Sequence, residues 1–403
     1  MNPVCHLPEW NLTNARVLLR ADLNVPLSKG AIADDYRLRA LVPTIQLIQQ
    51  KGGTIILLTH LGRPKGADPK LSTRILIPWF AAHGITVTYA ATPGDAAQIL
   101  HETSLKNDSG LPAPIILLEN LRFFPGEKAR DPHFAQTLAA LGDYYVNDAF
   151  GTLHRTDTSI TLVPALFAPE KRSIGLLVAK ELAALERLRT QAQKPFIAII
   201  GGGKVADKLP LIKGLLSKVD TILLCPAIVF TFLKAQGKEV GKSLIDQTQL
   251  AACIDIMAQA HEKKVTIDMP LDYQIAQDTI TDPLSYVDAE NFPVNGIGIS
   301  IGPKTIAAYT TVLVQAKTIF FNAAMGFAIR QETMAGTEAL LKAIAQATGF
   351  SIVGGGDSVA MAEKLGLEQK IGYLSTGGGA TLAAISGNEL PGLKALNNRT
   401  ETQ

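Results

Sequence analysis

The sequence has few cysteines, little net charge and no long hydrophobic run. Its three cysteines, Cys5, Cys225 and Cys253, are far apart and form no Cys-x-x-Cys pair, which argues against a disulfide framework and a zinc site. The net charge of +2 comes without the basic stripe of a nucleic-acid or acidic-membrane binder. The longest apolar stretch, 221–233, is too short to span a bilayer and contains a proline. We therefore expect a cytoplasmic protein that binds neither nucleic acid nor membrane.

The chain has the length and pattern of a two-domain α/β protein. Its 403 residues exceed one ordinary core, and 47% of them are hydrophobic. Short apolar runs alternate with helical patterns in both halves, which predicts two similar-sized domains, each a parallel sheet flanked by helices. Residues 174–192 resemble one long amphipathic helix without turn residues. We predict domains at 1–173 and 193–387, joined by that helix.

The expected strands are spread evenly over both halves. In the front half they are 16–20, 54–59, 86–89, 115–119 and 144–147. In the back half they are 196–200, 221–224, 264–267, 318–321, 349–353 and 372–374. Helical patterns lie between them, for example at 37–50 and 133–141. The remaining tail, 388–403, shows no strand pattern.

Three runs of three glycines, 201–203, 354–356 and 377–379, each follow an apolar run in the back half. Glycine allows positive φ and lets backbone N–H groups approach a ligand closely. A helix that begins there adds its positive end, so each turn is a candidate phosphate cradle. A single turn of this kind is equally well explained by strand-to-helix geometry. Three on one sheet indicate one site built at the carboxyl edge of the strands.

Arginine is concentrated in the front half, where ten of the 14 arginines precede Ser173. Its rigid fork suits phosphate and carboxylate groups. Four predicted strand ends each carry Arg, His or short polar residues. These are Asp22 and Asn24, His60 and Arg63, Arg122, and Arg155. A lone Arg or His is usually surface charge or a satisfied core group, and Asp22 with Asn24 also fits an Asx turn. Together they predict a pocket for a small anionic substrate.

The common nucleotide fingerprints are absent. A Walker loop ending at 241–243 would need glycine at position 236, which is Gln236. A Rossmann pattern begins at Gly296 and Gly298, but its third glycine is replaced by Ile301. Both an ordinary P-loop ATPase and an ordinary dehydrogenase are therefore disfavoured.

Taken in order, the motifs resemble the phosphoglycerate kinase family over nearly the whole chain. They are LRADLNVP at 19–26, HLGRP at 60–64, LENLR at 118–122, NDAFGTLHR at 147–155, GGGKVADK at 201–208, IGPKT at 301–305, GGGD at 354–357 and STGGGA at 375–380. The resemblance implies two α/β domains with an interdomain cleft, hinge closure and a tail, 388–403, packed on the front domain. It implies a monomeric glycolytic enzyme that moves a phosphoryl group between 1,3-bisphosphoglycerate and ADP, giving 3-phosphoglycerate and ATP, with Mg²⁺.

The resemblance also assigns roles by position. It places the phosphoglycerate pocket at Asp22, Asn24, Arg37, His60, Arg63, Arg122 and Arg155. It places the transferred phosphoryl group against Arg37, Lys204 and the backbone of Gly377, Gly378 and Gly379. It places the nucleotide at Gly201, Lys208, Ile329, Gly355, Gly356, Asp357 and Ser358, with Asp357 as the carboxylate for Mg²⁺.

Departures from the family pattern lie on the nucleotide side. The chain has Cys-Pro at 225–226 for Gly-Gly, and Phe-Asn-Ala-Ala at 321–324 for Trp-Asn-Gly-Pro. Ile329 stands where the family's ribose-binding Glu is expected, and Ser300 where Asp is common. We expect weaker or less selective nucleotide binding. Two alternatives stay open at this point, a non-catalytic phosphoglycerate-binding homologue and another α/β kinase of small acids.

Overall fold

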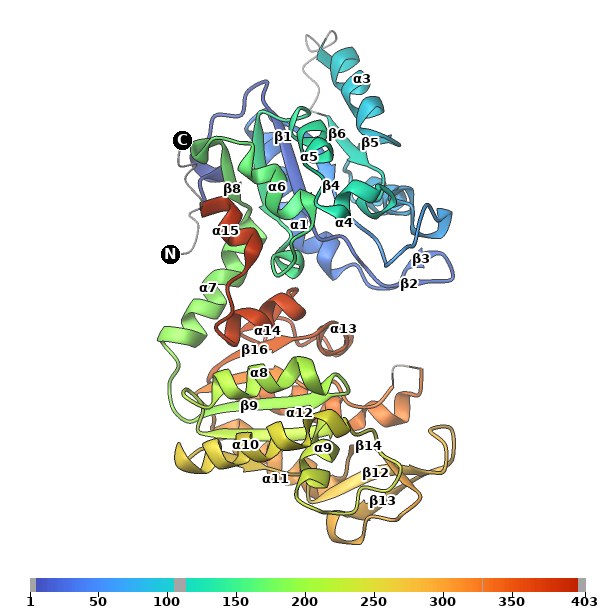
Figure 1. The fold of residues 1–403 in the computed structure, drawn as a ribbon, viewed down its shortest axis with the longest axis vertical. Coiled ribbons are helices and arrows are strands. Elements are labelled where there is room, and N and C mark those ends of the chain that lie inside the picture. Colours follow the sequence, from blue (N-terminus) through green and yellow to red (C-terminus); the bar gives the residue numbers. More distant parts are fainter. Residues whose placement is uncertain (1–4, 105–113, 328, 398–403) are drawn as a thin grey trace. The chain divides into compact units, whose positions relative to one another are not determined.

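A computed structural model describes residues 5–104, 114–327 and 329–397 of the chain. The chain divides into two compact units. Unit 1 holds the described residues up to Ala183 and from Glu389 onward, and unit 2 is Ala184–Asn388. Each unit contains a six-stranded parallel sheet flanked by helices (Figure 1), which confirms the predicted α/β class.

The sheet of unit 1 has the strand order β5-β6-β4-β1-β7-β8, with every pair parallel. Its strands are β1 (Arg16–Ala21), β4 (Thr54–Leu58), β5 (Val87–Ala90), β6 (Ile115–Leu118), β7 (Tyr144–Asp148) and β8 (Arg172–Ile174). The first five match the predicted strands to within one residue at each end. Strand β8 was not predicted because it has three residues and two of them are polar. A short antiparallel hairpin, β2 (Leu27–Ser28) with β3 (Ala31–Ile32), was also missed.

The helices of unit 1 are α1 (Tyr36–Gln50), α2 (Ile77–Ala82), α3 (Pro93–Ser104), α4 (Pro125–Ala129), α5 (Pro132–Ala139), α6 (Thr158–Ala165) and α15 (Pro391–Asn397). Helix α1 buries one apolar face, including Leu41 and Ile45, in the same core cluster as Leu19 of β1 and Leu57 of β4. This burial is the main favourable term that holds the helix on the sheet.

Near the C-terminus of the chain, α15 packs on α6 and β8 within unit 1 (Figure 1). The backbone N–H of Gly392 donates to the carbonyl of Leu153 at 2.9 Å. A Cβ on Gly392 would lie 2.6 Å from Leu153 Cδ2, so this close approach requires glycine. Residues 398–403 of the predicted tail lie outside the described residues.

Helix α7 (Leu176–Thr190) occupies the predicted connecting segment and contains the boundary between the two units. Its first turn is bound by side chains of unit 1. Thr44 Oγ1 accepts from the N–H of Leu176 at 3.2 Å, and Asp148 Oδ1 accepts from the N–H of Val178 at 3.0 Å. These bonds satisfy N–H groups that have no partner inside a helix.

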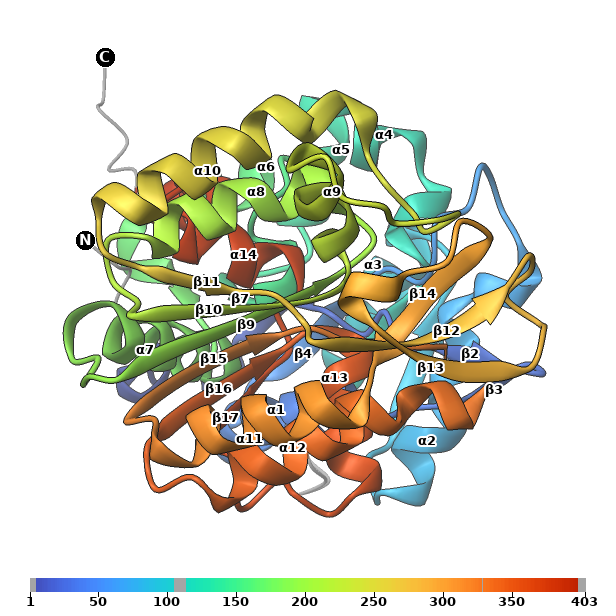
Figure 2. The same ribbon diagram turned by 90° about the horizontal axis from the view of Figure 1, so that it is seen from below.

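The parallel sheet of unit 2 has the order β11-β10-β9-β15-β16-β17. Its strands are β9 (Phe196–Gly202), β10 (Thr221–Ala227), β11 (Thr266–Asp268), β15 (Thr318–Asn322), β16 (Phe350–Gly354) and β17 (Tyr373–Ser375). All six were predicted. Its helices are α8 (Val205–Leu215), α9 (Ile228–Ala235), α10 (Leu250–Glu262), α11 (Pro303–Gln315), α12 (Ala335–Gln346), α13 (Gly356–Lys364) and α14 (Gly379–Ile385). Helices α8, α9 and α10 cover one face, and α11 and α12 the other (Figure 2).

Unit 2 also contains an antiparallel sheet that the sequence pattern missed. It has the order β13-β12-β14, formed by β12 (Asp272–Gln277), β13 (Leu284–Asp288) and β14 (Gly296–Ile301). No α-helix separates these strands, only the 3₁₀ turn Ala289–Asn291, and β13 is largely exposed, so the strand–helix alternation gave no signal. A Cβ on Gly298 would overlap the ring of Phe230, so this glycine of the incomplete Rossmann pattern serves packing.

None of the helices in the described ranges is long and apolar enough to cross a membrane.

Candidate active site

The carboxyl edge of the unit 1 sheet collects the predicted substrate residues. Asp22 and Asn24 follow β1, and His60 and Arg63 follow β4. Arg122 lies in a short 3₁₀ turn after β6, and Arg155 follows β7 and a second 3₁₀ turn. Because the strands are parallel, their carboxyl ends meet at one edge, and the predicted residues come to the same side of the sheet.

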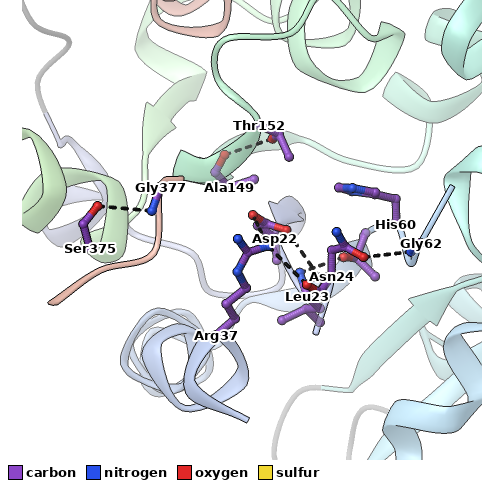
Figure 3. Close-up of polar contacts among 12 residues, drawn as sticks. Asp22, Leu23, Asn24, Arg37, His60, Gly62, Ala149, Thr152, Ser375 and Gly377 are labelled. Carbon is purple, nitrogen blue, oxygen red and sulfur yellow. Dashed lines mark hydrogen bonds and ion pairs between the residues drawn. The ribbon is translucent and has the colours of Figure 1, made fainter. Parts of the chain in front are cut away.

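An ion pair joins Asp22 to Arg37 of α1. Arg37 Nη1 lies 2.8 Å from Asp22 Oδ2 and also donates to the Asn24 carbonyl at 3.2 Å (Figure 3). The N–H of Asn24 donates to Asp22 Oδ1 at 3.3 Å, so the Asx turn considered above is also present. Asn24 Oδ1 accepts from the N–H of Gly62 at 2.7 Å and ties this segment to the loop after β4. Asp22 and Asn24 thus orient the loops and Arg37.

His60 is buried, with 2% of its surface exposed. Burial lowers its pKa well below the usual value, and the positive charges of Arg20 and Arg155 lower that pKa further. The imidazole is therefore neutral at pH 7. Its Nε2 is buried and has no hydrogen-bond partner among the described residues. Such an atom is costly to leave unpaired and marks a place for a ligand or water.

The arginines at this edge carry further unpaired donors. The buried Nε atoms of Arg122 and Arg155 have no partner in the part of the chain that the structure describes. Arg122 Nη1 donates to the carbonyl of Gly62, and its backbone N–H donates to Asn120 Oδ1 at 3.1 Å. Arg63 is exposed. An anion with several oxygen acceptors matches this set of N–H donors.

At the carboxyl edge of the unit 2 sheet, carbonyl groups hold the half-buried side chain of Lys208 in place. Lys208 Nζ donates to the carbonyls of Gly201 and Asn322, the latter at 3.0 Å, and to Asn322 Oδ1 at 2.7 Å. Burial lowers the pKa of Lys208 to about 8. A Cβ on Gly201 would lie 2.8 Å from Cys225 Cβ, so the replaced Cys-Pro segment packs directly against the first glycine run.

The second glycine run forms the N-terminus of α13. Gly355 is its N-cap, with φ of +101°, and Gly356 is exposed. Asp357 lies in the first helical turn and is exposed, whereas Ser358 is buried. No hydrogen bond or ion pair within the described ranges involves the carboxylate of Asp357. Backbone N–H groups and a nearby carboxylate suit a nucleotide phosphate that carries a divalent cation.

The third glycine run forms the N-terminus of α14. The N–H of Gly377 donates to Ser375 Oγ at 3.2 Å, so this amide is already engaged (Figure 3). Gly378 is the N-cap with φ of +47°, and Gly379 is exposed. Lys204, also exposed, precedes α8 at the end of β9. Gly378, Gly379 and Lys204 remain accessible to a phosphoryl group.

On the nucleotide side, Ile329 is 95% exposed. Glu332, three residues later, forms an ion pair with Arg330 at 2.8 Å. The side chain that replaces the expected carboxylate therefore stands in solvent, and Glu332 has another partner. No group of three His, Cys, Asp or Glu side chains able to hold a metal occurs in the ranges described.

Sequence reasoning gave no role to two residues at these edges. Asn322 Oδ1 accepts a hydrogen bond from Lys208 Nζ, and Asn322 Nδ2 donates to the Gly354 carbonyl at 3.0 Å. Asn322 thereby links two of the strand ends. Arg20, 1% exposed, contacts His60 from within β1. Its signal in the sequence was a charged residue between the apolar residues Leu19 and Ala21 of a strand.

Comparison with known proteins decides among the functions that this geometry allows. A family model for phosphoglycerate kinase matches residues 7–388. The chain belongs to the phosphoglycerate kinase family. The phosphoglycerate kinase of Moorella thermoacetica is 40% identical over 401 residues, 98% of this chain and 99% of that protein. A cytosolic phosphoglycerate kinase of Nicotiana tabacum is 41% identical over 400 residues, 97% of this chain and 98% of that protein.

Solved structures of this family agree. The phosphoglycerate kinase of Coxiella burnetii has a TM-score of 0.80 at 35% identity, covering 97% of this chain and 98% of its own. That of Pyrococcus horikoshii has a TM-score of 0.82 at 28% identity, covering 98% of each.

Proposed function

We propose that the chain catalyses the reversible transfer of a phosphoryl group from 1,3-bisphosphoglycerate to ADP, which gives 3-phosphoglycerate and ATP, the phosphoglycerate kinase step of glycolysis. The observation that carries this proposal is the set of unpaired donors at the unit 1 edge, His60 Nε2, Arg122 Nε and Arg155 Nε, in a chain of this family.

In this proposal unit 1 binds phosphoglycerate. Its substrate contacts come from His60, Arg63, Arg122 and Arg155, whose donors suit phosphate and carboxylate oxygens. Asp22 and Asn24 orient Arg37, which the ion pair with Asp22 holds on α1. Arg37 then contributes positive charge to the transferred group.

Unit 2 binds the nucleotide. The N-terminus of α13, with Gly355, Gly356 and Ser358, faces the nucleotide phosphates, and Gly201 closes the turn after β9. Lys208 is assigned to the same phosphates, and to reach them it must leave the carbonyls that now accept from it. Ile329 borders the ribose position, where it offers no hydrogen bond. The accompanying Mg²⁺ fits Asp357, because Mg²⁺ commonly takes one or two carboxylates plus phosphate oxygens.

Phosphoryl transfer depends mainly on in-line positioning and on positive charge around the moving group. Lys204, Arg37 and the N–H groups of Gly378 and Gly379 supply that charge. Gly377 shapes the turn, since its own N–H is bound by Ser375. Bound Mg²⁺ would neutralise charge on the nucleotide phosphates. No general base is required, because the acceptor is already anionic. Since the two substrates are assigned to different units, transfer requires hinge bending that brings them together.

We further propose that the chain acts as a monomer in the cytoplasm, with domains 1–173 and 193–387 and the tail 388–403 belonging to the first. The support is that named relatives include cytosolic phosphoglycerate kinases and that α15 packs on α6. The proposed partners are small molecules alone.

The nucleotide-side departures support a narrower proposal, that nucleotide selectivity is reduced. Cys225 and Pro226 occupy space beside Gly201, and Ile329 cannot bond to ribose hydroxyls. The measurement is kcat/KM with ADP and with GDP, for this chain and for a family member that has the usual Gly-Gly and Glu at the positions of Cys225-Pro226 and Ile329. Equal ADP:GDP preference in the two enzymes would contradict it.

The test of the main proposal is a coupled assay. The chain receives 3-phosphoglycerate and Mg-ATP, and NADH oxidation is followed through added glyceraldehyde-3-phosphate dehydrogenase. Turnover that depends on both substrates is expected. Folded protein that binds 3-phosphoglycerate but turns over neither ATP nor GTP would instead support a non-catalytic binding protein, the function favoured by Ile329 and the 225–226 segment.

A further inference from the structure

Arg20 is a charged side chain buried inside the central strand of unit 1. It is 1% exposed and lies in β1 between apolar residues. Its guanidinium makes three directed contacts. Nε donates to Ser159 Oγ at 2.8 Å, Nη1 donates to the carbonyl of Ala21, and Nη2 lies 3.3 Å from His60 Nδ1. The planar fork therefore has a fixed orientation.

The partners of Arg20 are themselves held in place. Ser159 donates through its N–H to Glu127 Oε2 at 2.9 Å and through Oγ to Glu127 Oε1 at 2.6 Å. Tyr145 donates to the Ser159 carbonyl at 2.7 Å. Glu127 is buried, and its proximity offsets the cost of burying the Arg20 charge. The network ends at His60, at the edge of the substrate pocket.

The contact with Arg20 determines which nitrogen of His60 carries the proton. A guanidinium can only donate, so Nδ1 of a neutral imidazole must accept and the proton must sit on Nε2. An Nδ1–H tautomer would place two donors 3.3 Å apart. Nε2 is the atom left without a partner among the described residues.

We propose that Arg20 is a positioning residue that fixes His60 in the Nε2–H tautomer, so that His60 presents one neutral donor to an oxygen of bound phosphoglycerate. The neutral state agrees with the lowered pKa of His60. The identity of the ligand rests on the proposed function, whereas the tautomer does not. Arg20 has no contact with substrate in this scheme and acts only through His60.

The first experiment reads the tautomer directly. Long-range ¹H–¹⁵N NMR on full-length protein labelled at histidine distinguishes protonated from unprotonated ring nitrogens, and His60→Gln assigns the signal. We expect a proton on Nε2 alone, with a shift of that signal when 3-phosphoglycerate is added. An Nδ1–H form or an imidazolium at pH 7 in the unaltered protein would overturn the proposal, whatever its activity.

The second experiment separates positioning from stability. Arg20→Lys keeps the charge near Glu127, but a point charge cannot contact Ser159 and His60 together. We expect mixed His60 tautomers and a KM for 3-phosphoglycerate raised about tenfold, the size of one hydrogen bond to a charged group, with kcat nearly unchanged. Arg16→Lys is the matched control, because Arg16 lies on the same strand but pairs with Asp143 at 2.6 Å.

Ser159→Ala provides an independent route if Arg20→Lys does not fold. It keeps Arg20 but removes the acceptor of its Nε, so a smaller rise in KM and a partial loss of the single tautomer are expected. An unchanged tautomer in whichever of the two variants folds would overturn the role of Arg20. A tautomer that behaves as expected in a protein without turnover would count against the proposed function only.

Discussion

At the carboxyl edge of the unit 1 sheet the proposed anion donors are side chains, whereas at the corresponding edge of unit 2 most of the proposed donors are backbone N–H groups. His60, Arg122 and Arg155 offer unpaired donors from buried atoms. In unit 2, Gly355 and Gly378 begin helices with positive φ. A site built from side chains depends on the buried residues that orient those side chains. A site built from backbone N–H groups depends on the absence of Cβ atoms and on helix geometry.

The two edges also differ in the partners of their positively charged side chains. In unit 1, Arg37 has a carboxylate partner and Arg20 lies near another, so each of these two charges is balanced within the unit. In unit 2, the half-buried Lys208 has only neutral carbonyl and amide oxygens as hydrogen-bond acceptors among the described residues. The unit 1 edge is therefore arranged before substrate arrives. At the unit 2 edge, Lys208 lies against neutral oxygens, and an anionic phosphate would stabilise its charge better than they do.

The largest effect is expected from the exposed lysine of unit 2. Lys204→Ala should lower kcat by roughly 10³-fold or more, as does removal of other cations that stabilise a transferring phosphoryl group. Lys204 is exposed, so little packing is lost. Steady-state kinetics is the measurement, with Lys213→Ala, a lysine within α8, as the control. A loss below tenfold would show that Lys204 does not contact the moving group.

A second prediction concerns an exposed side chain of unit 1. Arg63→Ala should raise KM for 3-phosphoglycerate about 10- to 100-fold with a much smaller change in kcat, since it removes a charge-assisted hydrogen bond. Arg74→Ala is the control, because Arg74 is an exposed arginine that stacks on Tyr89 at 3.9 Å. If KM stays unchanged, Arg63 lies outside the pocket and the unit 1 site is smaller than proposed.

Sequence patterns predicted the parallel sheets because each buried strand is an apolar run followed by a helix. The grouping of the residues that follow these strands could also be predicted, since parallel strands bring their carboxyl ends to one side. The antiparallel sheet β13-β12-β14 could not be found in this way, because no α-helix joins its strands. Gly298, which suggested a broken dinucleotide motif, is explained only by the ring of Phe230 packed against it.

The predicted site residues differ in their hydrogen-bond partners, and the sequence carries little information about those partners. The sequence places Arg20 in a predicted strand, but it does not identify Ser159 as its partner or Glu127 as the partner of Ser159, both of which lie far along the chain. Likewise, Lys208 is identified by its motif, but its contact with Asn322 depends on strands β9 and β15 being neighbours. Long-range pairing of this kind is set by the fold.

The third prediction tests whether the unit 2 edge depends on missing Cβ atoms. Gly201→Ala should destabilise the protein by about 1–3 kcal/mol, because its Cβ would lie 2.8 Å from Cys225 Cβ and 2.9 Å from the Pro226 carbonyl. Gly356→Ala is the matched control, since no atom lies within 4 Å of its added Cβ. Urea unfolding monitored by circular dichroism measures both. Equal stability of the two variants would show that segment 225–226 yields to the added methyl group.

The fourth prediction is a pH dependence that separates the two edges. The pKa of Lys208 is lowered by burial to about 8 from 10.5, so between these values the unfolded chain binds more protons than the folded chain. Stability should therefore rise with pH across that window, by at most about 1.4 kcal/mol per pH unit for one group. Lys208→Met removes the titrating group, so the difference in urea unfolding between the two proteins isolates it.

The same comparison with bound nucleotide sharpens the contrast between the units. Below pH 8 the folded state holds a charged Lys208 against neutral oxygens, and an anionic phosphate would stabilise that charge and raise its pKa. Mg-ATP should therefore reduce the rise in stability between pH 8 and 10.5 in the unaltered protein. It should leave the pH dependence of the stability of Lys208→Met unchanged. A pH-dependent difference that Mg-ATP does not change would mean that Lys208 stays on Asn322 and Gly201 in the complex. The unit 2 edge would then be as fully arranged in advance as that of unit 1.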